Sequence, residues 1–292
     1  MKFSRLYILA TVMAVFLTGC ASARLNQFST FAQAGITYAN ASQTLLTEAG
    51  KTSINADSAL LISTRPNLST DQRLTNVGIN NTLMRQRIEI LGKIGRHGRL
   101  LGQYFQALSA LADPKAGGSV GTAAQSTFNS IAKLSPDIKS AKIGGTSVAD
   151  FIPMVAKPIV AAYKVQALDN ELKARGESIA QEIALQQAAF QAIAKELSTD
   201  ARVIRNLQES ATNNQYASAS SLPSDWATQR FPLMSPPPPV AASNAAADAA
   251  DQLGKAWQAL LANKLDGNGF NLLMTDISNL LTIAQTVENA VK

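Results

Sequence analysis

One cysteine and one histidine limit the chemistry that this 292-residue chain can perform. A single Cys and a single His cannot form a zinc site of the usual nitrogen and sulfur ligands, and they cannot form an internal disulfide. A nucleophile–base mechanism would need His97 as its base, but His97 stands in a basic run, which is typical of a surface residue. The sequence also lacks a Gly-rich phosphate loop, a paired-carboxylate signature and a Gly-x-Ser-x-Gly motif. We therefore predict no catalytic residue, no metal ligand and no cofactor.

The cysteine ends a segment with the features of an export signal. Lys2 and Arg5 precede an apolar run from Leu6 to Leu17. This run is about twelve residues long, whereas about 20 apolar residues are needed to cross a bilayer. The run closes with Leu17-Thr18-Gly19-Cys20. These four residues resemble the lipobox of bacterial lipoproteins, in which a Leu, a small or polar residue and a Gly or Ala precede the modified cysteine.

The resemblance covers only the first twenty residues, and it implies a defined processing. Residues 1–19 would be removed as a signal peptide, and Cys20 would become the first mature residue. It would carry a diacylglycerol thioether and usually an acylated amine, with chains such as palmitate. Each buried methylene adds about 0.8 kcal/mol of membrane affinity, so two or three chains make a firm anchor. Ala21, rather than Asp, follows the cysteine, and by the same resemblance this favours the outer membrane over the inner one. The periplasmic and surface faces both remain open.

Long proline-free stretches make up most of the remaining chain. They are rich in Ala, Leu, Gln, Ile and Lys, which are strong helix formers, and no stretch shows the sustained alternation of a strand. With 46% hydrophobic residues and a net charge of +6, the composition is that of a folded protein. We predict an all-α protein, a bundle of about five to seven helices, several of them long. The expected helices cover residues 25–63, 71–112, 119–134, 158–213, 241–263 and 271–290.

A change of composition at about 214–240 marks a connection before the C-terminal helical pair. Asn, Ser and Pro become frequent there, and Pro236 to Pro239 predict an extended polyproline segment. We interpret this stretch as a long connection within one domain. The expected organisation is a signal peptide over residues 1–19, a lipidated tether over 20–24 and a single helical-bundle domain over 25–292.

Four glycines recur within the predicted helix 71–112, at spacings of three, three and four. They are Gly92, Gly95, Gly98 and Gly102. A helix turns by about 100° per residue, so these glycines would fall near one face. Each glycine inside a helix costs about 1 kcal/mol relative to alanine, and something must offset that cost. We predict that another helix packs closely against this face, because small residues let two backbones approach. The alternative is a segment that is not a continuous helix in every state.

The same window holds five basic residues against one acid, Glu89. The basic residues are Arg85, Arg87, Lys93, Arg96 and Arg99. One interpretation is a surface for an anionic partner, such as lipid headgroups, lipopolysaccharide phosphates, peptidoglycan carboxylates or an acidic protein. The other is a solvated helix face that pairs with acids on neighbouring helices. A nucleic-acid partner is not expected, because the stretch lacks interleaved aromatic residues.

Residues 143–163 form an apolar segment that contains two glycines and two prolines. Its length and its breaks exclude a membrane-spanning helix. It would be either a core hairpin between two helices or a mobile apolar tongue that inserts into a membrane or a partner. A long helical bundle with one apolar hairpin loosely resembles the α-helical pore-forming toxins, although only the architecture is shared and no motif.

Taken together, the sequence predicts a non-enzymatic lipoprotein of the bacterial envelope. It would act at the membrane surface as a binding or structural component, through the basic helix face at residues 85–99. Its partner would be another protein or an envelope component of unknown identity. The alternative is a membrane-active helical protein, pore-forming or inserting, that uses the apolar segment 143–163.

Overall fold

The long proline-free stretches fold as helices, and the chain is all-α, as predicted. The structure is a computed structural model that describes residues 3–113, 118–162, 165–234 and 238–291. Within these ranges its α-helices are α1 (Phe3–Thr64), α2 (Thr70–Leu111), α3 (Gly118–Lys139), α4 (Gln166–Ser218), α5 (Trp226–Arg230), α6 (Pro238–Leu261) and α7 (Gly267–Val291). Three short 3-10 helices are η1 (Arg65–Asn67), η2 (Val148–Phe151) and η3 (Phe231–Met234). Strands β1 (Lys142–Ile143) and β2 (Thr146–Ser147) pair antiparallel.

The first two helices form a long antiparallel hairpin. The chain turns through η1, which contains Pro66, because proline disfavours continuation of the helix. Ser69 then caps α2: its hydroxyl accepts a hydrogen bond from the Gln72 backbone N–H, and the Gln72 side chain accepts one from the Ser69 N–H. This reciprocal pair is a capping box, which fixes the start of α2 one residue before the predicted position.

The predicted start of the helix over 158–213 is wrong, because α4 begins only at Gln166. The described residues before it, 152–162, contain no regular element. The backbone N–H of Ala161 donates to the carbonyl of Leu261, at the end of α6, over 2.8 Å. The segment therefore satisfies backbone groups by lying across the bundle rather than by forming helical turns.

The polyproline prediction is also wrong at Pro238 and Pro239, which begin α6. Proline is favoured in the first turn of a helix, since its missing N–H would have no intrahelical partner there and its fixed φ suits the helix. Pro236 and Pro237 lie outside the described residues.

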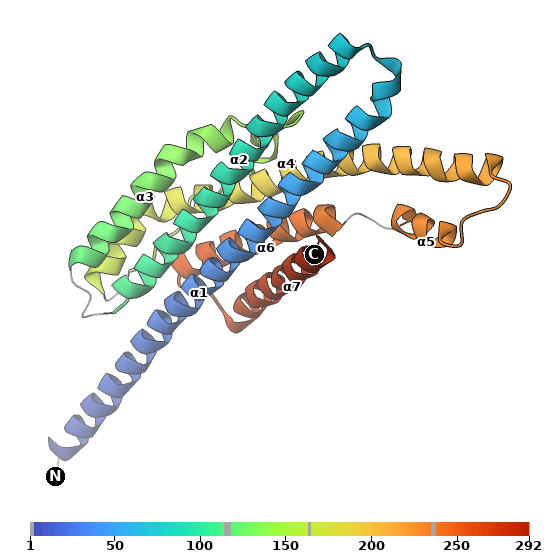
Figure 1. The fold of residues 1–292 in the computed structure, drawn as a ribbon. Coiled ribbons are helices and arrows are strands. Elements are labelled where there is room, and N and C mark those ends of the chain that lie inside the picture. Colours follow the sequence, from blue (N-terminus) through green and yellow to red (C-terminus); the bar gives the residue numbers. More distant parts are fainter. Residues whose placement is uncertain (1–2, 114–117, 163–164, 235–237, 292) are drawn as a thin grey trace.

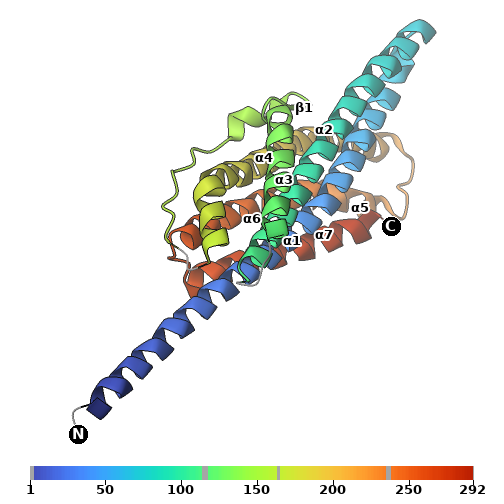
Figure 2. The same cartoon turned by 90° about the vertical axis from the view of Figure 1, so that its left-hand side faces the viewer.

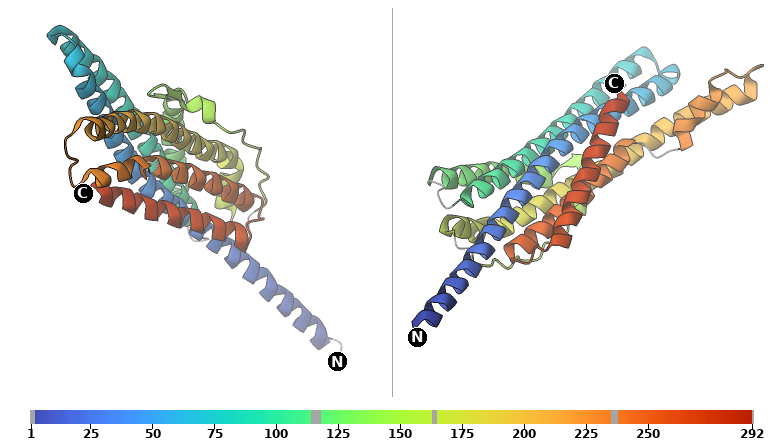
Figure 3. Two further views of the ribbon diagram at one scale, coloured as in Figure 1. Left: turned by 90° about the vertical axis from the view of Figure 1, so that its right-hand side faces the viewer. Right: turned by 90° about the horizontal axis from the view of Figure 1, so that it is seen from below.

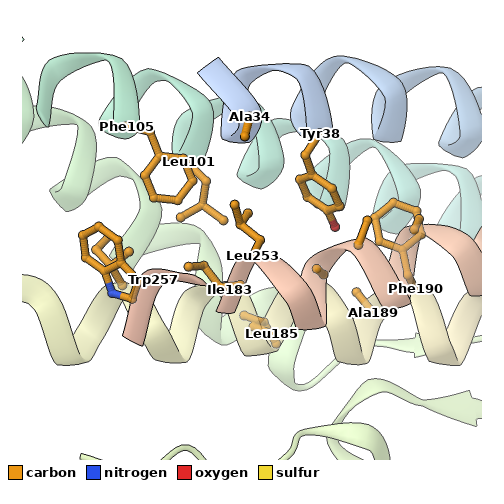
Figure 4. Close-up of a cluster of buried hydrophobic side chains, with 14 of the residues drawn as sticks. Ala34, Tyr38, Leu101, Phe105, Ile183, Leu185, Ala189, Phe190, Leu253 and Trp257 are labelled. Carbon is orange, nitrogen blue, oxygen red and sulfur yellow. The ribbon is translucent and has the colours of Figure 1, made fainter. Parts of the chain in front are cut away.

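The helices pack in layers around one hydrophobic core. The α1–α2 hairpin lies on the antiparallel pair α4 and α6, α3 packs along α2 and α4, and α7 packs along α6 and α1 (Figures 1 and 2). Figure 4 shows Tyr38 and Phe105 reaching down from the hairpin toward Phe190 on α4 and Trp257 on α6. The Trp257 ring contacts Phe105 and Phe31, with ring centroids 6.0 and 5.5 Å apart. Side chains from α1, α2, α4 and α6, the four main helices, thus meet in one cluster.

Beyond this core the helices part into two arms. Residues 54–84, which form the end of the α1–α2 hairpin, continue in one direction, and residues 202–218 of α4 continue in another (Figures 1 and 3). We call these the hairpin arm and the α4 arm. The segment with α5 and η3 returns along the α4 arm, where the Trp226 ring stacks on Tyr216 at a centroid distance of 5.4 Å. The two arms part near Ser53, Arg87 and Asp200.

Among the residues that the structure describes, no helix is both long and apolar enough to cross a membrane. α1 is continuous from Phe3, so the segment 20–24, predicted as a tether, is helical. The predicted lipidation site, Cys20, belongs to residues 1–25, whose side chains lie outside the described set.

Candidate functional site

A cleft of about 290 Å³ opens where the two arms part. Leu60, Leu83 and Met84 on the hairpin arm form one apolar wall, and Val203 on the α4 arm faces it. The polar lining includes Ser53, Asp57, Arg87, Lys142 and Asp200. We call this site the vertex cleft. Its volume is near the lower end of the range of known ligand pockets, about 300–1,000 Å³, so it suits a few side chains or a small molecule.

The floor of the vertex cleft is an ion cluster centred on Arg87. Its Nη2 lies 2.5 Å from Glu196 Oε1, and its Nη1 donates to Asp200 Oδ2 over 2.8 Å. The two acids are four residues apart on α4, so they lie on the same helix face. The Ser53 hydroxyl on α1 donates to the same Asp200 oxygen over 2.9 Å. The cluster therefore ties α1, α2 and α4 together at the point where they part, and its three charged side chains are each at most 13% exposed.

The β1–β2 turn closes one side of the cluster. Thr146 Oγ1 donates to Glu196 Oε2 over 3.2 Å. Gly144 has a φ of +60°, a conformation that L side chains rarely adopt, and a Cβ at this position would overlap the Glu196 carboxylate and the Arg87 guanidinium. Only glycine lets the turn approach the ion cluster this closely. Gly144, one of the two glycines of the apolar segment 143–163, is therefore part of the site.

Two carboxylates share one guanidinium, so the cluster has one more negative than positive charge. Burial raises the pKa of Asp200, and the neighbouring Glu196 carboxylate acts in the same direction, against the opposing effects of Arg87 and the Ser53 hydrogen bond. Asp57 and Lys142 line the same cleft and form no ion pair with any described residue. The site thus offers charges of both signs between apolar walls, an arrangement suited to binding.

Comparisons with known proteins do not add a function to this geometry. No protein-family model, no curated protein and no solved structure matches the chain. The function must therefore be inferred from the sequence and from the cleft itself.

The structure separates the five basic residues that the sequence groups on one helix face. Arg87 points toward α4 and belongs to the ion cluster. Lys93 pairs with Glu89 over 3.1 Å and with Asp137 on α3 over 3.0 Å. Arg87 and Lys93 therefore follow the second interpretation, in which the basic residues pair with acids. The other three, Arg85, Arg96 and Arg99, are exposed and share the outer face of α2. Because Arg85 precedes Arg87 by two residues, about 200° of rotation, this face looks away from the vertex cleft.

The predicted glycine stripe packs against other helices at three of its four positions. At Gly102, a Cβ would lie 3.3 Å from the Ala39 Cβ and 3.6 Å from the Ile36 Cα, so α1 and α2 approach closely there. Gly95 and Gly98 lie against Gln43 and Gln186. Gly92 does not belong to this contact: it is exposed, and no described heavy atom outside its own helix backbone and chain neighbours would lie within 4 Å of its Cβ. It lies three residues before Gly95, about 60° away from it around the helix, and this turns it toward solvent.

His97 is fully buried, so the expectation of a surface histidine is wrong. Its Nε2 lies 2.9 Å from Glu182 Oε2, and its Nδ1 lies 2.7 Å from the Gln186 amide nitrogen, which also donates to the Ile94 carbonyl. An amide nitrogen is a donor, so Nδ1 accepts and the proton is on Nε2. Ser135 donates to the same Glu182 oxygen rather than to His97. Both ring nitrogens are engaged, and no described hydroxyl or thiol is hydrogen-bonded to the imidazole as a nucleophile would be.

The apolar segment 143–163 behaves as a core element at its start. Ile143 and Val148 are fully buried, and the side chain of Val160 packs against the core from its far end. Between them, Met154 is fully exposed and Ile159 is largely exposed. The segment therefore forms a strap across the bundle, attached at both ends, up to residue 162, where the described range ends.

The residues that complete the site with Arg87 are ones that sequence reasoning missed. Glu196 and Asp200 interrupt the apolar seam of α4 at a spacing of four, and such a pair is a usable signal for a cation between helices. Within the described ranges, no group of three or more His, Cys, Asp or Glu side chains is placed to hold a metal ion.

Proposed function

We propose that this protein is a non-enzymatic binding protein of the bacterial envelope, anchored through an acylated Cys20, in the outer membrane rather than the inner one. Its binding site is the vertex cleft, and its partner is a polypeptide segment of another envelope protein. The signal segment and the sequence Leu17-Thr18-Gly19-Cys20 support the anchor. The geometry of the cleft supports the binding role.

One observation carries the binding proposal: apolar side chains stay exposed beside an almost buried ion cluster. Leu60 is 42% exposed and Leu83 is 56% exposed, although both line the cleft above Arg87. Burying charged groups costs desolvation free energy, and exposing large apolar groups forgoes hydrophobic stabilisation. A concave site with apolar walls and a few convergent polar groups is the usual composition of a binding site. A partner segment in the cleft would cover the leucines and leave the cluster in place.

The position of His97 supports the non-enzymatic part of the proposal. It is the single histidine of the chain, and both of its nitrogens are engaged inside the bundle, away from the vertex cleft. The described residues that line the cleft include no cysteine and no histidine. Histidine is the side chain most often used for general acid–base catalysis.

The height of the site above the anchor indicates what kind of partner reaches it. Ser53 follows Cys20 by 33 positions in one continuous helix, which is roughly 50 Å at 1.5 Å per residue. Electrostatic attraction to headgroups decays over about 8–10 Å at physiological ionic strength. With α1 upright, the vertex cleft therefore lies far outside the reach of the anchoring membrane. The same reasoning applies to the exposed Arg85, Arg96 and Arg99, whose anionic partner would be a protein or the cell wall.

The alternative proposal, membrane insertion through residues 143–163, has less support. Ile143 and Val148 would have to leave the core for the segment to insert. The two largely exposed apolar side chains of the strap, Met154 and Ile159, are five residues apart and give only a small apolar surface. The vertex cleft is accordingly the better candidate.

The anchor is tested on the mature N-terminus. We expect mass spectrometry of the protein from native envelopes to show a chain that begins at Cys20 and carries the mass of at least two acyl chains. Changing Cys20→Ser should leave residues 1–19 attached and abolish acylation. Changing Ala21→Asp should keep the acylation and shift the protein toward inner-membrane fractions. An unmodified Cys20 in the wild type would refute the anchor.

The binding site is tested by photo-crosslinking in intact cells. We expect a photoreactive residue at Leu83 to give one discrete protein adduct, and the same residue at Met154 on the strap to give none. The change Leu60→Glu, combined with the crosslinker at Leu83, should reduce the adduct about tenfold or more. A carboxylate in the apolar wall leaves a charge desolvated when the partner binds, which typically costs more than 1.4 kcal/mol.

The matched control for this experiment is Ile159→Glu, which puts the same charge on an exposed apolar residue outside the cleft. It should leave the Leu83 adduct unchanged. Lipid adducts from position 154, with no protein adduct from position 83, would instead favour the membrane-inserting alternative. Equal loss of the adduct in Leu60→Glu and Ile159→Glu would contradict the cleft as the binding site.

A further inference from the structure

The free end of the hairpin arm carries apolar side chains that no described part of the chain covers. Ile62 on α1 is 71% exposed, Leu74 on α2 is 69% exposed, and Val77 is exposed beside them. Figures 1 and 2 show this end projecting beyond the other helices. Several large apolar side chains exposed together usually mark a contact surface. We call this end, residues 61–77, the tip.

The tip is hollowed between its two helices. A shallow cavity of about 230 Å³ is lined by the aliphatic side chains Leu61, Ile62, Leu68 and Val77, together with Arg65 and Arg73. Arg73 donates through Nε to the backbone carbonyl of Arg65 over 3.0 Å, so its guanidinium is held beside the hollow. An aliphatic hollow with two guanidinium groups at its edge suits a ligand that joins an anionic group to a hydrocarbon chain.

Within the part of the chain that the structure describes, no acidic residue lines this hollow to neutralise the two arginines. Asp71 is the nearest acid along the chain, and it precedes Arg73 by two residues in α2. Two residues correspond to a rotation of about 200°, so Asp71 lies on the opposite side of the helix from the hollow. Neither arginine forms an ion pair with another described residue. The hollow therefore presents an uncompensated positive charge.

We propose that the tip binds the surface of an anionic phospholipid bilayer, with lipid phosphates on Arg65 and Arg73 and acyl methylenes against Ile62, Leu74 and Val77. Exposed apolar residues next to basic ones are the features that hold a protein segment in a membrane interface. A protein partner is the weaker occupant, because a stable protein interface usually buries about 800 Å² on each side and the end of a two-helix arm offers few residues.

This contact would lie far from the lipid anchor. Thr64 follows Cys20 by 44 positions in the same helix, which is roughly 66 Å. A chain anchored at Cys20 with α1 upright would therefore meet a second bilayer rather than its own, and would bridge the two. The inference goes beyond the binding role of the vertex cleft and does not depend on it.

A vesicle-docking experiment tests the proposal on the full chain. The protein is reconstituted in phosphatidylcholine vesicles that are fixed on beads, and free dye-labelled vesicles are added. We expect capture of free vesicles that contain phosphatidylglycerol, and no capture of pure phosphatidylcholine vesicles. Each arginine near an anionic surface contributes about 1 kcal/mol, or about fivefold, so the double change R65E and R73E should reduce capture at least 25-fold, to roughly background. The change Leu74→Asp should also reduce capture, because it removes an apolar contact.

The matched control is the double change R96E and R99E, which alters the same amount of charge on an exposed part of α2 far from the tip. It should leave capture within about twofold of wild type, because these sites lie more than two screening lengths from the docked bilayer. Inorganic phosphate added at the concentration of the lipid phosphate should not compete, since it lacks the acyl chains. The proposal is overturned by absence of docking, by equal loss in the two double variants, or by full competition from inorganic phosphate.

Discussion

Replacing Arg87 with methionine should destabilise the fold by about 3 kcal/mol, because Glu196 and Asp200 would then face each other almost buried and without a cation. That is a large share of a typical stability of about 5–15 kcal/mol. For a chain of this size it corresponds to a fall in Tm of roughly 6–12 °C. Thermal unfolding followed by circular dichroism measures the change. Arg85→Met is the matched control: Arg85 is exposed on the same helix, so its loss should change stability by less than about 0.5 kcal/mol.

The cause of this loss can be separated from simple loss of packing. If the unpaired carboxylates are responsible, the triple change Arg87→Met, Glu196→Gln and Asp200→Asn should recover most of the stability, to within about 1 kcal/mol of wild type. If packing of the arginine is responsible, the triple variant should be as unstable as the single one. A second outcome that contradicts the interpretation is an equal effect of Arg85→Met and Arg87→Met.

The pH dependence gives an independent signature of the same cluster. The pKa of Asp200 is raised above its usual 3.8 in the folded protein, so its deprotonation costs folding free energy as the pH rises through the folded-state pKa. Removing Arg87 increases that cost, because the cation that stabilises the carboxylate is lost. The stability difference between Arg87→Met and wild type should therefore be largest at neutral pH and shrink as the pH falls to about 4. A difference that stays constant with pH would exclude the carboxylates as its cause.

The fold class could be predicted from the sequence because helix signals are local. Proline-free runs of helix formers and the Pro66 turn specify the end of α1 and both ends of α2 within a few residues. The predicted start of α1, residue 25, is wrong, because the helix already begins at Phe3. The other boundaries that failed, at Gln166 and Pro238, depend on information that is not local. The strap before α4 is held by a hydrogen bond to the end of α6, and a run of prolines is compatible with both an extended segment and a helix start.

The site was harder to predict than the fold, since it depends on which helix faces which. The spacing of Arg85, Arg87, Lys93, Arg96 and Arg99 shows that they are close in sequence, but Arg87 points the opposite way from Arg85. Its partners Glu196 and Asp200 are more than a hundred residues away. His97 shows the same difficulty: its basic neighbours suggest solvent, but its own position on the helix faces α4. For both Arg87 and His97, the direction of the side chain could be predicted only by knowing that α4 packs against this face of α2.

The second large effect is expected at Trp257, where the four main helices meet. The indole is fully buried against Phe31 and Phe105, and its Nε1 donates to the Gly176 carbonyl of α4 over 2.9 Å. Truncation of a buried tryptophan to alanine typically costs about 3–5 kcal/mol, through lost burial and the cavity left behind. Trp257→Ala should therefore lower the Tm by roughly 6–20 °C. Trp257→Phe keeps most of the volume but loses the hydrogen bond, so it should cost less.

Trp226→Phe is the matched control, because this second tryptophan lies on the α4 arm, stacked on Tyr216 and partly exposed. It should change the global Tm by only a few degrees. An equal fall in Tm for Trp226→Phe and Trp257→Ala would mean that the core does not depend on the helices meeting at Trp257.

The Trp257 variant also separates stability from binding. The vertex cleft is built from other residues, so Trp257→Ala should keep the crosslink from Leu83 at temperatures well below its lowered Tm. The cleft change Leu60→Glu should instead keep the wild-type Tm within a few degrees and lose the crosslink, since Leu60 is already 42% exposed in the free protein. Loss of the crosslink in both variants while both remain folded would place the binding surface elsewhere on the bundle. If Trp257→Ala lowers the Tm but keeps the crosslink, and Leu60→Glu keeps the Tm but loses the crosslink, then the core holds the arms and the cleft binds the partner.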